Sequence, residues 1–356
     1  MTLIGILKRT FGALSGLLLL FAAQAAPLQA QEFEKNIMTG GPSGTYIQIG
    51  RNLSEVARSC DLTLNVVESA GSLENFLAVR NRRNTQFGIV QSDVLEYLRT
   101  FASDDPDVAR AILGVRMAFP LYNEEVHILA RKDITDLKGL AGKRVAIGTE
   151  NSGTYLTASL VLDLAQINPA ERVTINANDS LEALLAGQID AFFYVAGAPA
   201  SLFQSDRIDP AEYHLLGIDE PTLQAVYVPA QIEAGTYPFQ QEAVDLVAVK
   251  AVLMTYEYQT ARNNYHRTSC KAVSDIAYLL TSRFSRLQES GHPKWKQVDL
   301  ADLPPGWDIS ACVNTGLAPD YSLTCRSDDT LGVEVDSLES EANAAYRAQI
   351  CKVMGC

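Results

Sequence analysis

Short apolar runs alternate with helical patterns in the first third of this chain, and that alternation is what most limits its fold. Residues 36–39, 62–68 and 87–91 have the composition of strands, and residues 45–59 and 72–83 have the apolar spacing that predicts helices. Parallel strands need a crossover between them, usually a helix. The order strand, helix, strand, helix, strand therefore predicts an α/β domain with a largely parallel sheet.

The middle of the chain repeats this alternation. A strand is predicted in two pieces, at residues 126–130 and 143–148, and further strands are predicted at residues 172–176 and 190–195. Helices are predicted between them, at residues 152–165 and 181–186. At roughly 100–200 residues per domain, a chain of 356 residues has room for about two domains. We therefore expect two α/β units.

The last third of the chain predicts fewer elements. Further strands are expected at residues 227–228 and 246–249, and a long helical pattern runs from about residue 257 to residue 286. Asp336 and Glu339 have the spacing of a capping box, which predicts a last helix from there through Ile350.

The first thirty residues are predicted to be a secretory signal peptide. Lys8 and Arg9 precede an apolar run at residues 13–23 and then small residues, so we expect cleavage after Ala25 or Ala30, with Ala30 favoured. The run is shorter than the roughly 20 residues that span a bilayer, which disfavours the alternative of an uncleaved anchor. We therefore expect an exported, soluble protein of the periplasm.

The charge of the chain excludes one class of partner. The formal net charge is −13, and it becomes −15 once Lys8 and Arg9 are removed with the signal peptide. Nucleic-acid affinity depends mainly on Lys and Arg contacts to phosphates. We therefore expect no DNA or RNA partner.

Six cysteines in an exported chain predict disulfides, because an even count suits an oxidising compartment. Four of them fall within residues 312–356, where we expect at least one disulfide. Cys60 and Cys270 would then pair across the chain. The chain has no CxxC motif and its four histidines are scattered, so no metal site is expected. The six cysteines are Cys60, Cys270, Cys312, Cys325, Cys351 and Cys356.

One string, Ser-Gly-Thr-Tyr, occurs twice, at residues 43–46 and 152–155. Each copy lies where a predicted strand leads into a predicted helix, so free backbone N–H groups and the positive end of the helix dipole would point outward. A carboxylate or another small anion fits such a turn. The alternative is that Ser and Thr only cap the helices. Two matching copies in two units favour a shared ligand.

Neither copy predicts nucleotide or hydrolase chemistry. The glycines of residues 40–45 resemble a P-loop, but no Lys follows Gly44. The pattern G-x-S-x-G of a nucleophile elbow is absent around Ser43. No local grouping of Ser, His and Asp indicates a triad, although one assembled across the chain stays open. We expect no enzyme activity and no cofactor.

Several short strings of the chain match those of a known family in order and spacing. The strings are Thr39-Gly40-Gly41 with Gly44-Thr45-Tyr46, Glu68 to Asn75, Phe87 to Asp93, Leu121 to His127, Leu137 to Val145, Ser152 to Thr154, Gly187 to Phe193, and Gly235 to Pro238. Taken together, they resemble the TAXI class of solute-binding proteins, the extracytoplasmic receptors of tripartite ATP-independent periplasmic (TRAP) transporters. The resemblance covers residues 36–295, while the cysteine-rich tail from about Leu300 is atypical.

The resemblance implies a two-lobed type II periplasmic-binding-protein fold with mostly parallel sheets and crossing hinge strands. It implies lobe I at residues 31–125 and about 226–300, lobe II at about 126–225, and a separate tail at about 301–356. It also implies a small carboxylate ligand, such as glutamate or 2-oxoglutarate, and a partnership with the integral-membrane TRAP permease.

By position, the resemblance carries ligand-binding roles to two groups of residues. Three of these side chains also fit purely structural roles, because Tyr46 could pack on the first helix, Asn75 could cap a turn and Phe193 could fill the sheet. The first group is Ser43, Gly44, Thr45, Tyr46, Gly71, Ser72, Gln91, Ser152, Gly153 and Thr154, and the second is Asn75, Asp190, Phe193 and Pro199.

Two other functions compete with transport. A periplasmic ligand sensor partnered with a membrane histidine kinase would use the same lobes. A secreted α/β hydrolase would need a nucleophile and a base, which the scattered histidines disfavour.

Overall fold

The computed structural model describes residues 35–42, 44–60, 62–102, 104–224 and 226–323. The signal peptide, the helix expected after Asp336 and the cleft candidate Ser43 lie outside the described residues. Among the described helices, none combines the length and the apolar composition that crossing a bilayer requires.

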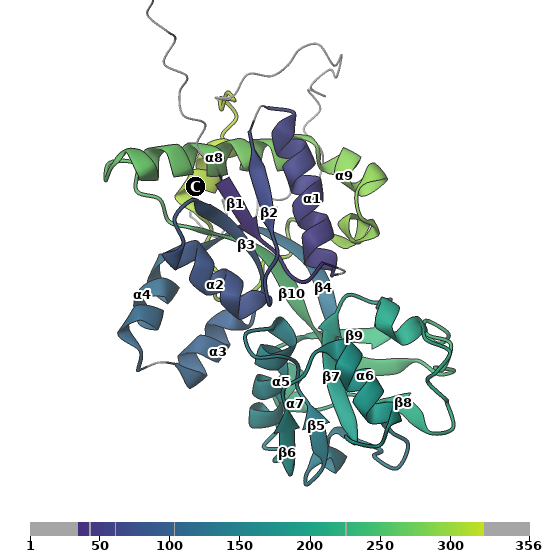
Figure 1. Ribbon diagram of the computed structural model, residues 1–356. Coiled ribbons are helices and arrows are strands. Elements are labelled where there is room, and N and C mark those ends of the chain that lie inside the picture. The colour runs from purple at the N-terminus through teal and green to yellow at the C-terminus, as the bar shows by residue number, and fades with distance from the viewer. Residues whose placement is uncertain (1–34, 43, 61, 103, 225, 324–356) are drawn as a thin grey trace, which may run out of the picture. The chain divides into compact units, whose positions relative to one another are not determined.

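The described strands form one mixed sheet in the order β2-β1-β3-β10-β4-β7-β5-β6, with β8 beside β4 and β9 beside β10 (Figure 1). Strands β1, β2 and β3 pair in parallel, as do β5, β6 and β7, whereas β4 and β10 pair antiparallel with each other and with β7 and β3. The strands are β1 (Lys35–Met38), β2 (Leu64–Val67), β3 (Thr85–Gln91), β4 (Val115–Arg131), β5 (Arg144–Ala146), β6 (Glu171–Val173), β7 (Ala191–Ala196), β8 (Tyr213–Leu215), β9 (Val228–Ile232) and β10 (Val244–Tyr256).

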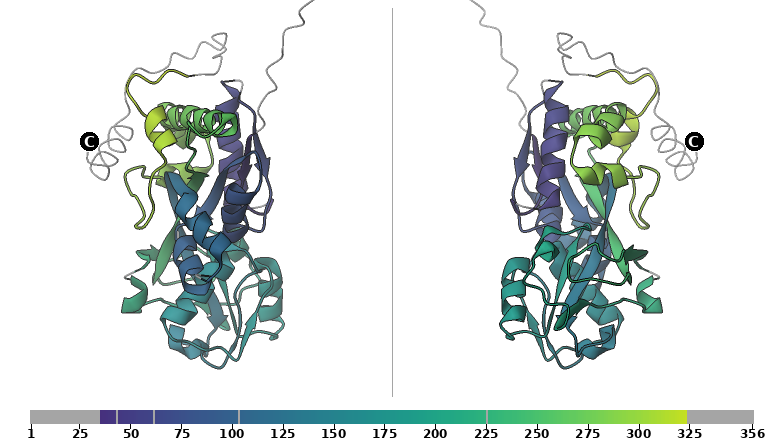
Figure 2. Two further views of the ribbon diagram at one scale, coloured as in Figure 1. Left: turned by 90° about the vertical axis from the view of Figure 1, so that its left-hand side faces the viewer. Right: turned by 90° about the vertical axis from the view of Figure 1, so that its right-hand side faces the viewer.

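The sheet carries two hydrophobic cores, which make this a two-lobed α/β fold. Helices pack on both faces of the strands (Figure 2). The helices are α1 (Thr45–Arg58), α2 (Ser72–Asn81), α3 (Val94–Phe101), α4 (Pro106–Gly114), α5 (Gly153–Leu164), α6 (Ala177–Leu185), α7 (Pro221–Gln224), α8 (Asn264–Ser282), α9 (Phe284–Ser290) and α10 (Ala311–Gly316), with short 3₁₀ turns η1 (Leu137–Leu140), η2 (Ser201–Gln204) and η3 (Pro293–Gln297).

Strands β4 and β10 connect the two cores. In β4, Leu121 and Tyr122 belong to the first core and Val126 to the second. In β10, Val249 belongs to the second core and Ala251 to the first. Both long strands therefore cross from one lobe to the other as hydrogen-bonded neighbours.

Helix α5 also contributes to both cores. Leu156 and Leu160 are buried in the first core, while Val161 and Leu162 are buried in the second. Its apolar surface thus extends around most of the helix, which is typical of a helix buried between two layers. This packing brings the N-terminal end of α5 against the first lobe.

The long helical pattern expected at residues 257–286 is two helices with a later start. Strand β10 runs to Tyr256, and α8 begins only after Asn263, whose side-chain oxygen accepts a hydrogen bond from the backbone N–H of His266 (3.0 Å). An N-cap of this kind fixes where a helix starts. Arg283 then separates α8 from α9.

One expected cysteine pairing is wrong. Cys270 in α8 is bonded to Cys312 in α10, so Cys60 and Cys270 do not pair with each other. Cys60 is also in a disulfide. The physical reason is that α10 packs along α8, and Val313 of α10 and Leu317, which follows it, join the first core. The start of the predicted tail is therefore part of the first lobe.

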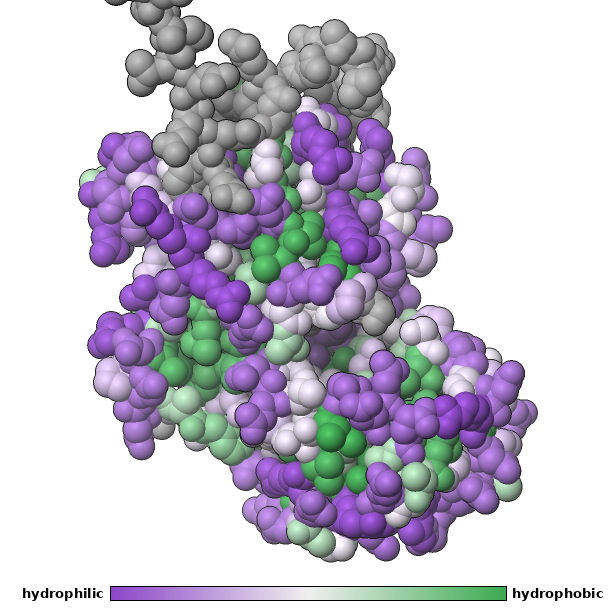
Figure 3. All heavy atoms as spheres, in the orientation of Figure 1, coloured by the Kyte–Doolittle hydropathy of each residue, from purple (hydrophilic) through white to green (hydrophobic). Residues whose placement is uncertain are grey.

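The surface drawn in Figure 3 is mostly hydrophilic, with hydrophobic residues gathered in separate patches. The large hydrophobic side chains exposed among the described residues are Phe101, Leu113, Val226 and Val228.

Candidate functional site

Three helices begin at the carboxyl ends of parallel strands. Helix α1 follows β1, α2 follows β2 and α5 follows β5. The N-caps of α1 and α2 are Gly44 and Gly71, which provide no side-chain cap. The first-turn N–H groups of α1, and those of α2 apart from the Leu73 N–H, are therefore available to a bound anion, together with the positive end of each helix dipole.

The N-terminus of α5 differs from the other two. The Ser152 hydroxyl oxygen accepts a hydrogen bond from the Tyr155 N–H (3.1 Å) and so caps the helix. The Thr154 hydroxyl oxygen accepts one from the Val195 N–H (3.1 Å) of β7. These two side chains thus serve the structure of their own lobe, which matches the capping alternative for the second copy of the repeated turn.

The turns of the two lobes touch. The Leu73 N–H at the start of α2 donates to the Asn151 carbonyl (3.3 Å) just before α5. A Cβ added at Gly71 would lie 3.2 Å from the Gly153 nitrogen, and one added at Gly153 would lie 2.3 Å from Gln91 Oε1. Gly71 also has φ +128°, which favours glycine. Both glycines are needed for this close approach.

A buried carboxyl group, Glu124 of β4, lies beside these turns. Its Oε2 accepts hydrogen bonds from the Tyr46 hydroxyl (2.7 Å) and from Gln91 Nε2 (3.3 Å). Glu124 is 5% exposed. Burial raises the pKa of Glu124 to about 7, against the lowering effect of the hydrogen bonds from Tyr46 and Gln91.

Two further groups complete this cluster, which we call the Glu124 cluster. The Tyr122 hydroxyl is buried without a hydrogen-bond partner among the described residues. Lys294 Nζ of η3 lies 5.6 Å from the centre of the Tyr122 ring and donates to Gln297 Oε1 (2.6 Å). Burial lowers the pKa of Lys294, while Glu125 and Glu124 raise it. The Glu124 cluster is thus Tyr46, Gln91, Tyr122, Glu124 and Lys294.

A second buried carboxyl joins the lobes. Asp93 Oδ2, next to α3, accepts from the Thr157 hydroxyl of α5 (2.8 Å) and from the Tyr227 hydroxyl (3.0 Å). Thr157 also reaches Gln91 Oε1 (3.1 Å). Burial raises the pKa of Asp93 to about 7, although both hydroxyl bonds lower it. Asp93 Oδ1 has no partner among the described residues.

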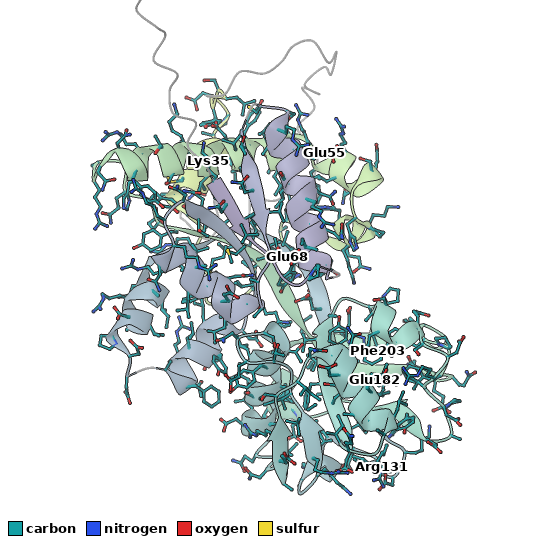
Figure 4. All side chains as sticks on the ribbon, in the orientation of Figure 1. Lys35, Glu55, Glu68, Arg131, Glu182 and Phe203 are labelled. Atoms are coloured by element: carbon teal, nitrogen blue, oxygen red, sulfur yellow. A yellow bond between two sulfur atoms is a disulfide. The ribbon has the colours of Figure 1, made fainter. Side chains whose placement is uncertain are left out.

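The sequence-predicted residues that the structure brings to this junction are Gly44, Thr45, Tyr46, Gly71, Ser72, Gln91, Ser152, Gly153 and Thr154. Ser72 is buried there, and its hydroxyl accepts from the Gln91 N–H (3.0 Å). The turn after β2 starts at Glu68, which Figure 4 places near the beginning of α1.

Four predicted site residues, Asn75, Asp190, Phe193 and Pro199, are not among the residues at the junction. The Asn75 amide is used by the carbonyls of Thr39 (2.5 Å) and Ile89 (2.7 Å). Phe193 is buried in the second core. Pro199 follows a cis peptide bond, next to Ala200, whose N–H donates to the Tyr237 hydroxyl (3.0 Å).

Asp190, the fourth, lies at the opposite end of its sheet. It directly precedes β7, whereas the turn at residues 148–153 follows the parallel strand β5. Its carboxylate pairs with Arg144 (3.0 Å) and Arg131 (3.3 Å). Arg131 is labelled at the far end of the lobe in Figure 4. The structure therefore gives Asp190 an ion-pair role there and does not bring it to the junction.

Sequence reasoning missed Tyr122, Glu124, Asp93 and Lys294 as site residues. Tyr122, Glu124 and Asp93 lie inside strings that match the family. A polar residue within or directly after an apolar strand pattern was the sequence signal that could have identified them. Lys294 had none, because η3 reaches the junction only through the fold.

Two lobes joined by two crossing strands, with helix N-termini and buried polar groups meeting at the junction, define a ligand-binding protein of the periplasmic-binding type. Residues 37–272 match the NMT1-like family, and the chain belongs to that family. The family is one of binding domains rather than enzymes.

Three solved structures to which this chain is similar are the following. A periplasmic transporter is 12% identical, with 90% of this chain and 96% of its own covered, and has a TM-score of 0.44. A TctC solute binding protein from Polaromonas is 12% identical, with 90% and 98% coverage and a TM-score of 0.38. The periplasmic VFT2 domain of BvgS from Bordetella pertussis is 13% identical, with 70% and 93% coverage and a TM-score of 0.39.

Proposed function

We propose that this protein is a TAXI-class receptor that captures a small carboxylate, such as glutamate or 2-oxoglutarate, and delivers it to a TRAP membrane permease. The sequence resemblance spans residues 36–295, and the family match over residues 37–272 supports ligand binding along nearly the same stretch. We also propose that the chain is exported to the periplasm and that residues 1–30 are removed as a signal peptide.

One observation carries the proposal. The first turns of α1 and α2 have no side-chain cap and begin beside the Glu124 cluster. A ligand carboxylate placed there would accept hydrogen bonds from backbone N–H groups, and such bonds to a charged group are stronger than neutral ones. The buried amide, hydroxyl and ammonium groups of the cluster would then form hydrogen bonds with the rest of the ligand and so determine which ligand binds.

We assign the ligand site to the predicted junction residues and to the groups found beside them. They are Gly44, Thr45, Tyr46, Gly71, Ser72, Gln91, Ser152, Gly153 and Thr154, with Tyr122, Glu124 and Lys294 added. Ser43, which lies outside the described residues, is kept in the proposal. The Ser152 and Thr154 hydroxyls accept hydrogen bonds within their own lobe and can still donate to a ligand.

We propose that the lobes close about the two crossing strands. The proposed lobe I runs from residue 31 to about residue 125, and the change of core along β4 between Tyr122 and Val126 supports this second boundary. For the return crossing, core membership favours the step from Val249 to Ala251 over residue 226. Lobe I would then resume at about residue 251.

Calorimetric titration of the mature protein with glutamate and 2-oxoglutarate tests ligand capture. We expect saturable binding of one of them, and Thr45→Ala should weaken it by about ten- to a hundredfold, the effect of losing one hydrogen bond to a charged group. If Thr45→Ala lowers the melting temperature but binds like the wild type, Thr45 only supports the helix. If no small carboxylate binds, the ligand class is wrong.

Gly153→Val gives a second, geometric test. Its side chain would start 2.3 Å from Gln91 Oε1, so Gln91 must move away from Glu124 and Thr157. We expect ligand affinity to fall at least tenfold. Gly217→Val is the matched control, because its Cβ would meet nothing closer than the Asp245 carbonyl at 3.4 Å. Equal affinities of the two variants would remove Gly153 from the site.

The partner is tested separately with vesicles that contain a TRAP permease. Receptor-dependent uptake of the bound carboxylate supports transport. Failure of uptake, together with ligand-dependent phosphorylation of a membrane histidine kinase, would replace transport by sensing while leaving ligand capture intact.

A further inference from the structure

A cavity lies in the first lobe, away from the lobe junction. It has a volume of about 400 Å³ and lies between the C-terminal end of α2, the loop to β3 and the segment that leads from β10 into α8. Figure 1 shows α2 and α8 in the same lobe. Helix α2 has ten residues. At a rise of about 1.5 Å per residue, its two ends put the cavity and the junction roughly 14 Å apart.

Among the described residues, the lining of this cavity includes four arginines and no carboxylate. Arg80, Arg82 and Arg83 come from the end of α2 and the residues after it, and Arg262 comes from the segment before α8. The chain as a whole has 42 acidic and 29 basic residues. The charged residues found in the cavity lining are nevertheless all arginines. All four arginines are exposed, so water and salt screen their mutual repulsion, and they offer their N–H donors to an anion that enters from solution.

The arginines differ in how far their charge is already compensated. Arg82 pairs with Glu74 (2.7 Å), which lies outside the lining. The Arg80 guanidinium lies 5.8 Å from the centre of the Tyr256 ring, a cation–π contact that holds it in place. Arg83 and Arg262 have no ion pair with a carboxylate among the described residues.

The rest of the lining adds hydrogen-bond donors and rigid walls. His266 is buried, and its Nδ1 accepts from the Gln259 N–H (3.0 Å), so Nε2 carries the ring proton and can donate. Tyr256, Tyr258 and Tyr265 pack edge to face around this imidazole. This packing holds the three tyrosine rings in place beside the arginines of the lining.

We propose that this cavity binds a phosphate-type oxyanion of charge −2 or more. Guanidinium groups present paired N–H donors that match two oxygens of a phosphate, and several of them converging from two segments suit a multiply charged group better than a single carboxylate. The oxyanion is either free in solution or the headgroup of an anionic phospholipid. The cavity shares no residue with the Glu124 cluster, so this site is independent of the proposed carboxylate ligand.

Titration of the mature protein with inorganic pyrophosphate at low ionic strength tests the free form. We expect saturable binding that weakens with added salt and falls at least tenfold in the double variant Arg83→Gln/Arg262→Gln. The matched control is Arg51→Gln/Arg286→Gln, which removes two exposed charges outside the cavity. Equal losses in both double variants would reduce the effect to net charge and overturn the proposal.

Vesicle flotation tests the lipid form. Vesicles that contain phosphatidic acid, whose headgroup is a phosphomonoester that can carry a charge of −2, are compared with vesicles of phosphatidylcholine. We expect the wild type to float only with the anionic vesicles if a headgroup is the ligand. The cavity variant should lose this flotation while the control variant keeps it. Binding of pyrophosphate alone assigns the free anion, and binding of the anionic vesicles alone assigns the headgroup. Binding of neither overturns the proposal, and equal melting temperatures of the variants show that folding is not the cause.

Discussion

Glu124 poses an electrostatic problem for a site that is proposed to hold an anion. An ionised glutamate buried next to a carboxylate ligand would repel it strongly, because the surroundings screen charge poorly. Burial raises the pKa of Glu124 to about 7, so a proton is retained there under mildly acidic conditions. A protonated Glu124 can also donate a hydrogen bond to the ligand.

We therefore expect carboxylate affinity to depend on pH through this one residue. Ligand binding favours the protonated form of Glu124, so the affinity should fall by about tenfold as the pH rises from 6 to 8. Calorimetric titrations with 2-oxoglutarate at both values measure it. Glu124→Gln should abolish the dependence, while Glu55→Gln, on an exposed face of α1, should keep it. A pH dependence that persists in Glu124→Gln would assign the proton to another group.

The Thr157 hydroxyl of helix α5 makes a polar contact with the first lobe. Thr157 donates toward both Asp93 Oδ2 and Gln91 Oε1 from a fully buried position. Asp93 Oδ1 has no partner among the described residues, so Asp93 depends on its contacts with Thr157 and Tyr227. Helix α5 thus combines apolar packing in both cores with a polar contact between them.

Thr157→Val keeps the side-chain shape and removes this hydroxyl. We expect the free energy of unfolding to fall by roughly 1–3 kcal/mol, the cost of leaving a buried acceptor short of a partner. Thr315→Val is the control, because the Thr315 hydroxyl donates only to the Ala311 carbonyl on an exposed face of α10 and should change stability by less than about 0.5 kcal/mol. Urea denaturation of both variants decides, and equal losses would contradict the contact.

The sequence predicted most of the elements around the junction but not its interior. Strands β1 to β3 and helices α1 and α2 lie within a few residues of their expected positions, because apolar periodicity and turn residues are local signals. Helices α3 and α4 were not predicted. The pairing of Cys270 with Cys312 and the approach of Lys294 depend on helix packing over long sequence distances, which no local pattern records.

Three buried titratable groups connect the stability of the whole molecule to pH. Burial raises the pKa of Glu124 and of Asp93 to about 7, and it lowers the pKa of His127 to about 4. A raised carboxyl pKa gives stability that is full below the unfolded value and is lost as the pH rises through 7. The lowered His127 pKa acts oppositely, because stability is lost as the pH falls from about 6.5 toward 4.

Between pH 5.5 and pH 7.5, the loss of stability from Glu124 and Asp93 is larger than the gain from His127. We expect the free energy of unfolding to be lower at pH 7.5 than at pH 5.5 by roughly 1–3 kcal/mol. Urea denaturation at the two values measures it. The double variant Glu124→Gln/Asp93→Asn should lose this decrease, and a wild type that is more stable at pH 7.5 would contradict the assignment.

The bond between Cys270 and Cys312 closes a loop with a sequence separation of 42 residues. Chain-entropy arguments for a loop of this length give a stabilisation of about 4 kcal/mol. The double variant Cys270→Ala/Cys312→Ala should therefore unfold at a clearly lower urea concentration. Ligand affinity should be unchanged, because both cysteines lie in α8 and α10, away from the junction. Unchanged stability would mean that helix packing alone holds α10.

The two crossing strands are irregular at the level where the cores meet. Lys250 pairs with Asn123 and Val252 with Pro120, so Leu121 and Tyr122 together face Ala251 alone, which makes a β-bulge. Pro120 has no N–H to contribute to the ladder. A bulge weakens regular pairing and increases local twist, so rotation of one lobe against the other would concentrate its bending there. Tyr122, which lies in the bulge, would then move with every such rotation. The contacts of Tyr122 with the ligand and the angle between the lobes would therefore change together.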